Sequence, residues 1–154
     1  MFSRWPLQAE DVPVGGRITR IVRARVDWNG TPLTIFGVHL HWPLSRGNAQ
    51  ARAEELQALA AAARSESAPV LIAGDFNLTP WSRWFARFVA ESGLQDCALG
   101  QGLLGTWPAQ VMPPMRIRID QCFASAQWRV HRVSVGPRLG SDHLPTVVEL
   151  GPPP

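Results

Sequence analysis

The chain lacks lysine and tyrosine altogether and contains only two cysteines among its 154 residues. Cys97 and Cys122 are too few for a disulfide framework, and they do not have the CxxC spacing of zinc and redox sites. We therefore expect two ordinary buried thiols. The sequence also has no run of about 20 apolar residues and no apolar signal-peptide core. These absences predict a soluble chain without a transmembrane segment, cytoplasmic by default.

Arginine supplies all 15 basic residues, against 12 acidic ones, which gives a net charge of +3 and a calculated pI near 10.0. The high pI reflects the chemistry of arginine more than a charge excess, so charge alone does not indicate nucleic-acid binding. Hydrophobic residues make up 45% of the chain and charged residues 18%. That composition excludes a disordered chain and fits one globular domain over residues 1–150, with a Pro-rich tail at 151–154.

Apolar patterns predict the strands. Alternation and continuous apolar runs place them at residues 17–28, 33–40, 70–73, 116–123, 128–135 and 147–150. Asn29-Gly30 is typical of a hairpin turn between the first two. Residues 100–114, rich in glycine and proline, are expected to form a loop.

Two helices are predicted between these strands. Residues 47–64 have the three-and-four spacing of an amphipathic helix, with Glu54 and Glu55 on its solvated face. A second helix is expected to follow the capping residues Thr79 and Pro80 and to end at Gly93. The resulting order, β-β-α-β-α-β-β-β, predicts a mixed α/β fold.

Side chains able to perform chemistry lie at the ends of the predicted strands. They are His39, Asp75, Asn77, Asp120, Asp142 and His143. Each alone has an ordinary structural explanation as a turn former, a helix cap or a core histidine. Together they indicate a site, because strand ends are where α/β enzymes position reactive groups.

Three local strings carry most of these residues in a set order along the chain. They are Gly74-Asp75-Phe76-Asn77 with Thr79-Pro80, then Arg118-Ile119-Asp120, then Gly140-Ser141-Asp142-His143-Leu144-Pro145. With Val38-His39-Leu40 before them, the strings resemble the endonuclease/exonuclease/phosphatase superfamily. The flanking residues Thr106-Trp107-Pro108 resemble its bacterial members in particular. The resemblance implies a deoxyribonuclease I-like fold, in which a mixed β-sheet sandwich is flanked by helices.

Phosphoester hydrolysis explains why these residue types occur together. Asp75 can orient and deprotonate a water molecule, Asn77 can donate to a phosphate oxygen, and protonated His143 can bind the phosphate. The resemblance implies that Asp120 is the partner of His143 and that His39 assists the leaving group. It also implies a divalent cation held by Asp142, Asp75 and Asn77. Oxygen ligands of this kind favour Mg²⁺ or Mn²⁺.

The main departure from the family lies at the front of the chain. Family members carry an earlier segment that supplies an Asn and a Glu to the metal site, and neither has a counterpart here. Glu10, for example, is expected in a loop. We therefore expect the C-terminal part of a catalytic domain, incomplete at its N-terminus, whose exposed sheet surface favours self-association.

Two functions follow, and both stay open. One is a metal-dependent phosphoesterase acting on a phosphodiester or phosphomonoester, with nucleic acid among the candidate substrates. The other is a non-catalytic remnant that binds a partner or a phosphorylated ligand.

Other residues near the motifs also have two interpretations. Trp42 is either an exposed indole that stacks on a base or sugar, or an ordinary loop residue. His41 forms a zinc pair with the histidine two positions earlier only if that strand continues past Leu40. Arg116 and Arg118, on one face of a predicted strand, either contact phosphate or are solvated. Gln121 stands where the family commonly has an aromatic or histidine residue.

Overall fold

The computed structural model describes residues 1–16 and 19–151. In chain order the elements are β1 (Leu7–Asp11), β2 (Ile21–Trp28), β3 (Thr31–His39), α1 (Arg46–Ser65), β4 (Val70–Asp75), α2 (Arg83–Ser92), β5 (Gln95–Asp96), the 3-10 helix η1 (Pro113–Met115), β6 (Asp120–Ala124), β7 (Arg129–Val135) and β8 (Thr146–Gly151). Within the described residues, neither α-helix combines the length and apolar character needed to cross a bilayer.

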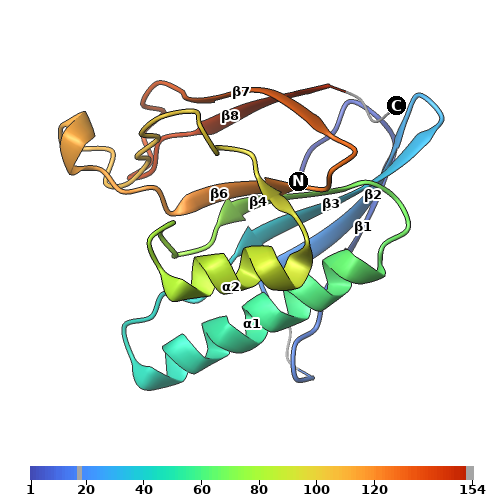
Figure 1. Ribbon diagram of the computed structural model, residues 1–154, viewed down its shortest axis with the longest axis horizontal. Helices are drawn as coiled ribbons and strands as arrows, with labels where there is room; N and C mark the ends of the chain where they lie inside the picture. The colour runs from blue at the N-terminus through green and yellow to red at the C-terminus, as the bar shows by residue number, and fades with distance from the viewer. Residues whose placement is uncertain (17–18, 152–154) are drawn as a thin grey trace.

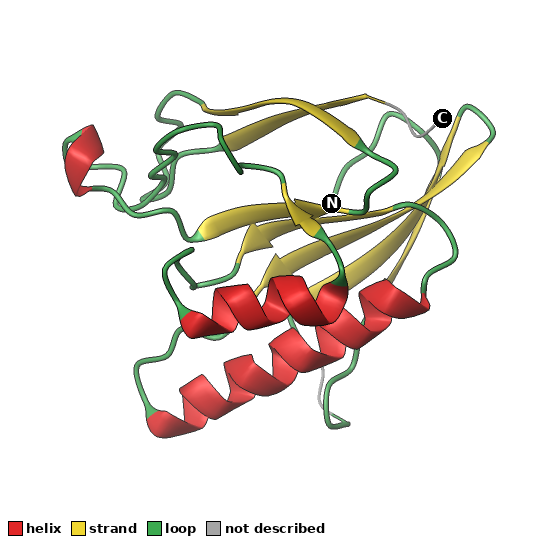
Figure 2. Ribbon diagram, in the orientation of Figure 1, coloured by secondary structure: helices red, strands yellow, loops and turns green. Residues whose placement is uncertain are grey.

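The elements form three layers. A six-stranded sheet, in the order β1-β2-β3-β4-β6-β5, lies at the centre. Helices α1 and α2 lie side by side over one face, and the two-stranded β7–β8 sheet lies over the other (Figures 1 and 2). This arrangement confirms the predicted mixed α/β fold, in which two sheets pack as a sandwich with helices on the outer face.

An aromatic cluster fills the space between the central sheet and the helices. Phe76, Phe88 and Phe123 are fully buried, and their ring centroids lie 4.9–5.6 Å apart. Phe85 packs on Phe123 at 5.3 Å. Edge-to-face contacts of this kind add to the stabilisation from buried apolar area. Helix α2 thus buries Phe85 and Phe88 in the core, whereas Trp81 lies before the helix and is exposed.

The register of the central sheet brings three of the candidate site residues together. Strand β3 pairs in parallel with β4 and places His39 opposite Asp75. Strand β4 pairs antiparallel with β6 and places Asp75 opposite Asp120. Two strands therefore end, and a third begins, at the same edge of the sheet.

Several predicted boundaries need correction. Strand β1 was not predicted, and Glu10 lies in it rather than in a loop; the strand exists because it pairs with β2 along its whole length. Within the predicted strand 17–28, β2 begins at Ile21, and residues 17 and 18 lie outside the described part. Strand β8 extends through Gly151, the first residue of the predicted tail, and residues 152–154 lie outside the description.

The second helix also begins later than predicted. Ser82, not Thr79, is its N-cap, because the Ser82 hydroxyl accepts a hydrogen bond from the Trp84 amide. Gly93 ends the helix in the left-handed conformation at φ 72°, as expected.

The two cysteines are neighbours, with Cys122 in β6 and Cys97 directly after β5. Both thiols are free and buried, with their Sγ atoms 2.7 Å apart, and the Cys97 amide donates to the Cys122 carbonyl. The hydrogen bond to Cys97 and burial raise the pKa of the Cys122 thiol. Two buried thiols are what the sequence predicts.

Candidate active site

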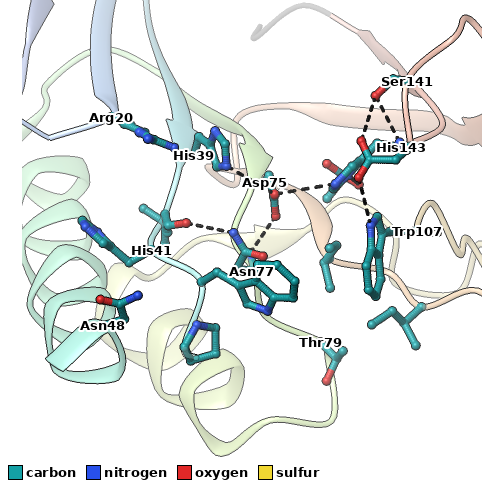
Figure 3. A pocket seen from close by; sticks show the side chains of 17 residues that line it. Arg20, His39, His41, Asn48, Asp75, Asn77, Thr79, Trp107, Ser141 and His143 are labelled. Atoms are coloured by element: carbon teal, nitrogen blue, oxygen red, sulfur yellow. Dashed lines mark hydrogen bonds and ion pairs between the residues drawn. The ribbon is translucent and has the colours of Figure 1, made fainter. Parts of the chain in front are cut away.

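A cavity of about 810 Å³ opens at the sheet edge where β3, β4 and β6 meet. All six predicted site residues line it. Figure 3 shows Asp75 near the middle of the group, with His39 and His41 on one side and His143 and Trp107 on the other. The structure therefore brings the predicted residues into one place.

Asp75 stands between two imidazole rings. Its Oδ2 atom lies 3.8 Å from His39 Nε2 and 4.0 Å from His143 Nε2, while its Oδ1 accepts a hydrogen bond from the Asn77 amide at 2.7 Å. Burial, together with the charge of Asp120, raises the pKa of the Asp75 carboxyl against the opposing effects of that hydrogen bond and the two histidines. A carboxylate with a raised pKa is a better base for a water molecule.

His143 is held by Asp120 on its far side. Its Nδ1 lies 2.9 Å from Asp120 Oδ2, and the same oxygen accepts from the hydroxyl of Thr106, which is fully buried. The imidazole is thus oriented with Nε2 toward Asp75. Burial opposes the charged imidazole, but the hydrogen bond and charge of Asp120, with the charges of Asp75 and Asp142, raise the pKa of His143.

The turn after β4 is shaped to present Asp75 and Asn77. Asn77 adopts a positive φ of 49°, a conformation that asparagine tolerates better than most residues. Its Nδ2 donates to the Leu40 carbonyl at 2.9 Å, and its own carbonyl accepts from the buried Arg52 guanidinium. Position 74 requires glycine, since a Cβ there would lie 2.0 Å from the Val38 carbonyl oxygen. Gly74 also has a φ of +146°, which side-chain-bearing residues rarely adopt.

Asp142 lies at the exposed rim of the cavity. Its Oδ2 accepts from the Trp107 indole at 3.4 Å. Among the described residues, one group of three has potential metal-ligating atoms within 4.8 Å of one another, and it consists of Asp75, Asp120 and His143. Asp142 is not part of that group.

Oxygen atoms suited to a hard cation are nevertheless present. Within the described part of the chain, no group donates a hydrogen bond to Asn77 Oδ1 or to Asp75 Oδ2. Asp142 adds an exposed carboxylate on the same cavity. Carboxylate and amide oxygens are what Mg²⁺ and Mn²⁺ prefer, so this donor set fits the expected metal.

Supporting residues of the site were missed or misplaced by the sequence interpretation. Glu55 does not lie on a solvated face: it is buried, its Oε1 lies 2.7 Å from His41 Nδ1, and its Oε2 accepts from the His41 amide. The contacts by which Thr106 holds Asp120 and Arg52 holds Asn77 were not predicted. Arg52 and Glu55 are three positions apart on α1, a spacing that places them on one helix face.

The structure shows the surroundings of His41, Arg116 and Arg118, each of which has two interpretations in the sequence. Strand β3 ends at His39 and His41 turns to Glu55, so these two histidines do not form a zinc pair. Arg116 and Arg118 precede β6 rather than lying in it. Arg118 pairs with Asp96 at 2.7 Å, Arg116 donates to the Val111 carbonyl, and neither residue lines the cavity.

Gln121 and Trp42 have opposite environments. Gln121 is buried, donates to the carbonyls of Leu78 and Arg118, and does not line the cavity. Trp42 is exposed on the cavity rim, with its ring 6.2 Å from Trp107 in an edge-to-face arrangement.

Together, the fold and site define an α/β sandwich with a histidine–carboxylate centre at a sheet edge. The chain belongs to the endonuclease/exonuclease/phosphatase family, whose model matches residues 1–143. The fold is the deoxyribonuclease I-like fold expected from the sequence. No curated protein matches the sequence.

Solved structures share the fold over almost the whole chain. An endonuclease/exonuclease/phosphatase from Beutenbergia cavernae has a TM-score of 0.77 and 27% identity, covering 97% of this chain and 46% of that one. A conserved protein of unknown function from Enterococcus faecalis has a TM-score of 0.70 and 17% identity, covering 94% and 67%.

A mannosyl-6-phosphatase from Bacteroides thetaiotaomicron has a TM-score of 0.63 and 23% identity, covering 85% of this chain and 55% of that one. The chain thus spans between 46% and 67% of the length of these three structures.

Proposed function

We propose that the protein is a divalent-metal-dependent phosphoesterase that hydrolyses a phosphodiester or phosphomonoester. The observation that carries the proposal is the position of the Asp75 carboxylate, between His39 and a His143 that Asp120 holds in place. Membership of a family named for nucleases and phosphatases supports phosphoester chemistry.

Each residue has a role in the proposed reaction. Asp75 accepts a proton from a water molecule whose oxygen attacks the phosphorus atom, and the bond to the leaving oxygen breaks. His143, charged through its contact with Asp120, binds a phosphoryl oxygen. His39 gives a proton to the leaving oxygen. Asn77 uses one amide hydrogen on Leu40, and the other remains for the phosphate.

The expected cation is Mg²⁺ or Mn²⁺. Asp142, Asp75 and Asn77 would hold it through their side-chain oxygens. When bound, such an ion neutralises charge on the phosphoryl group and so lowers the barrier to attack by water.

The direct test is hydrolysis of a chromogenic phosphodiester and a chromogenic phosphomonoester with Mg²⁺, Mn²⁺ or EDTA. We expect turnover that requires metal and that falls about 10²- to 10⁴-fold in His143→Ala. His131→Ala, an exposed histidine on β7, is the matched control and keeps the wild-type rate. Absence of turnover in a folded sample would instead favour a non-catalytic remnant that binds a phosphorylated ligand or a partner.

We also propose that the protein self-associates. Strand β1 ends the central sheet, and among the described residues no strand pairs with its outer edge. An unpaired edge offers free backbone donors and acceptors to another copy. Sedimentation equilibrium should show a dimer or larger species, and a monomer at every concentration would exclude this association.

A further inference from the structure

One wall of the cavity takes no part in the proposed reaction. Arg20, His41 and Asn48 line this wall, and Figure 3 shows them on the side of Asp75 opposite Trp107 and His143. The three side chains come from the segment before β2, the loop after β3, and the first turns of α1.

Arg20 is a cation without an internal partner. Its side chain is exposed and makes no ion pair or hydrogen bond within the part of the chain that the structure describes. Its backbone is fixed, because the His39 amide donates to the Arg20 carbonyl at 3.0 Å. The Arg20 backbone is therefore anchored directly beside His39, the histidine that protonates the leaving oxygen in the proposed reaction.

The side chain and the backbone amide of His41 are both held by the buried Glu55. Both carboxylate oxygens of the buried Glu55 bind this one residue, one at its ring Nδ1 and the other at its amide. With Nδ1 engaged at 2.7 Å, the ring keeps Nε2 for another contact, and nearly half of the side chain is exposed. Burying a carboxylate is costly unless it is paired, so the Glu55 carboxylate keeps both of its contacts with His41. These contacts fix the orientation of the His41 ring.

The acidic groups of the cavity do not neutralise Arg20. Asp75 lies between His39 and His143, Asp120 binds His143 and Thr106, and Asp142 binds Trp107. The wall at Arg20 thus keeps its positive charge, and Asn48 adds an amide donor to it.

We propose that Arg20 and His41, with Asn48, bind a second phosphate group of the substrate, adjacent to the phosphate that is hydrolysed. The planar guanidinium is suited to bidentate contact with phosphate oxygens. Glu55 is a positioning residue, acting through His41. This inference rests on the proposed function and deepens it: the substrate class is a phosphoester that carries a further phosphate.

Binding to the metal-free chain tests the subsite separately from catalysis. The probes are methylphosphonate, with one anionic group, and propylene diphosphonate, with two, measured by calorimetry after metal removal on a chelating resin. We expect the wild-type chain to bind the diphosphonate at least tenfold more tightly, a difference of about 1.4 kcal/mol. In Arg20→Gln and His41→Gln this preference disappears, while methylphosphonate binding is unchanged.

Matched controls are available on β7, away from the cavity. Arg132→Gln and His131→Gln change the same residue types at exposed positions and keep the wild-type preference. Glu55→Gln reduces the preference for the diphosphonate and leaves methylphosphonate binding unchanged. A simple loss of stability would weaken the binding of both probes. Arg20 is exposed, so its variant folds even if the buried Glu55→Gln variant does not.

The results separate the subsite from the proposed function. Equal affinity of the wild-type chain for both probes, or a preference that survives Arg20→Gln, overturns the subsite even if the chain hydrolyses phosphoesters. A preference lost in Arg20→Gln supports the subsite even if no hydrolysis is found.

Discussion

Replacing Asp120 by Asn tests how His143 is kept charged. The substitution preserves the size of the side chain but removes the charge that faces His143 Nδ1 at 2.9 Å. A hydrogen bond to a charged group contributes about 1.5–3 kcal/mol, against about 0.5–1.5 kcal/mol for a neutral one. The expected loss is therefore about 1–2 kcal/mol, and about 1.4 kcal/mol corresponds to one pKa unit.

The assay is an NMR titration of the imidazole resonances. Four histidines contribute signals, and His143→Gln assigns the relevant one. We expect the pKa of His143 to fall by about one unit in Asp120→Asn. Because the pKa of His143 is raised in the folded chain, protonated His143 contributes to the free energy of unfolding. This contribution is fully present below about pH 6.5, and it is lost as the pH rises through the pKa of His143 in the folded chain. The variant should therefore lose more stability at acidic than at alkaline pH. An unchanged pKa of His143 would refute the reasoning.

Further predictions concern the rate profile, the turn after β4 and the core. The rate of hydrolysis should rise with pH as Asp75 ionises, at a pH above the usual range for aspartate. It should fall again as His143 loses its proton, at a pH above the usual value for histidine. A rate that does not fall at alkaline pH would contradict the role of His143. Gly74→Ala should cost more than about 3 kcal/mol in urea unfolding, because its Cβ meets the Val38 carbonyl; a wild-type midpoint would show that the turn can move. Phe123→Ala should lose about 3–5 kcal/mol by removing the ring on which Phe76, Phe85 and Phe88 pack, and a loss below 1 kcal/mol, by thermal melting, would argue against that cluster.

The elements that were predicted best carry their own signal in the sequence. Helix α1 has the three-and-four apolar spacing of an amphipathic helix, and strands β3 and β4 contain nearly continuous apolar runs, as buried strands do. Strand β1 has no such signal, because Leu7 alone in it is partly buried and the other four residues are exposed. It is a strand because it pairs with β2, and pairing is a tertiary property. Its prediction requires knowledge of its neighbour.

The residues of the candidate site also fall into those identified from local motifs and those whose roles depend on tertiary contacts. His39, Asp75, Asn77, Asp120, Asp142 and His143 were identified because they lie in short motifs at strand ends, and the sheet register explains why they meet. Glu55 was misassigned because its partner, His41, is 14 positions away, and only the packing of α1 against the loop after β3 brings them together. The contact of Thr106 with Asp120 was missed for the same reason, since it spans 14 residues across a loop.

The central claim is that Asp75 activates water in a metal-dependent hydrolysis. The most direct measurement is the rate at which the wild-type chain and Asp75→Asn hydrolyse a chromogenic phosphodiester with Mg²⁺, and with EDTA in its place. Asp11→Asn, an exposed position on β1, is the control. The account predicts metal-dependent turnover in the wild type and control, and a rate at least about 10²-fold lower in a folded Asp75→Asn. Equal rates in wild type and Asp75→Asn would contradict it.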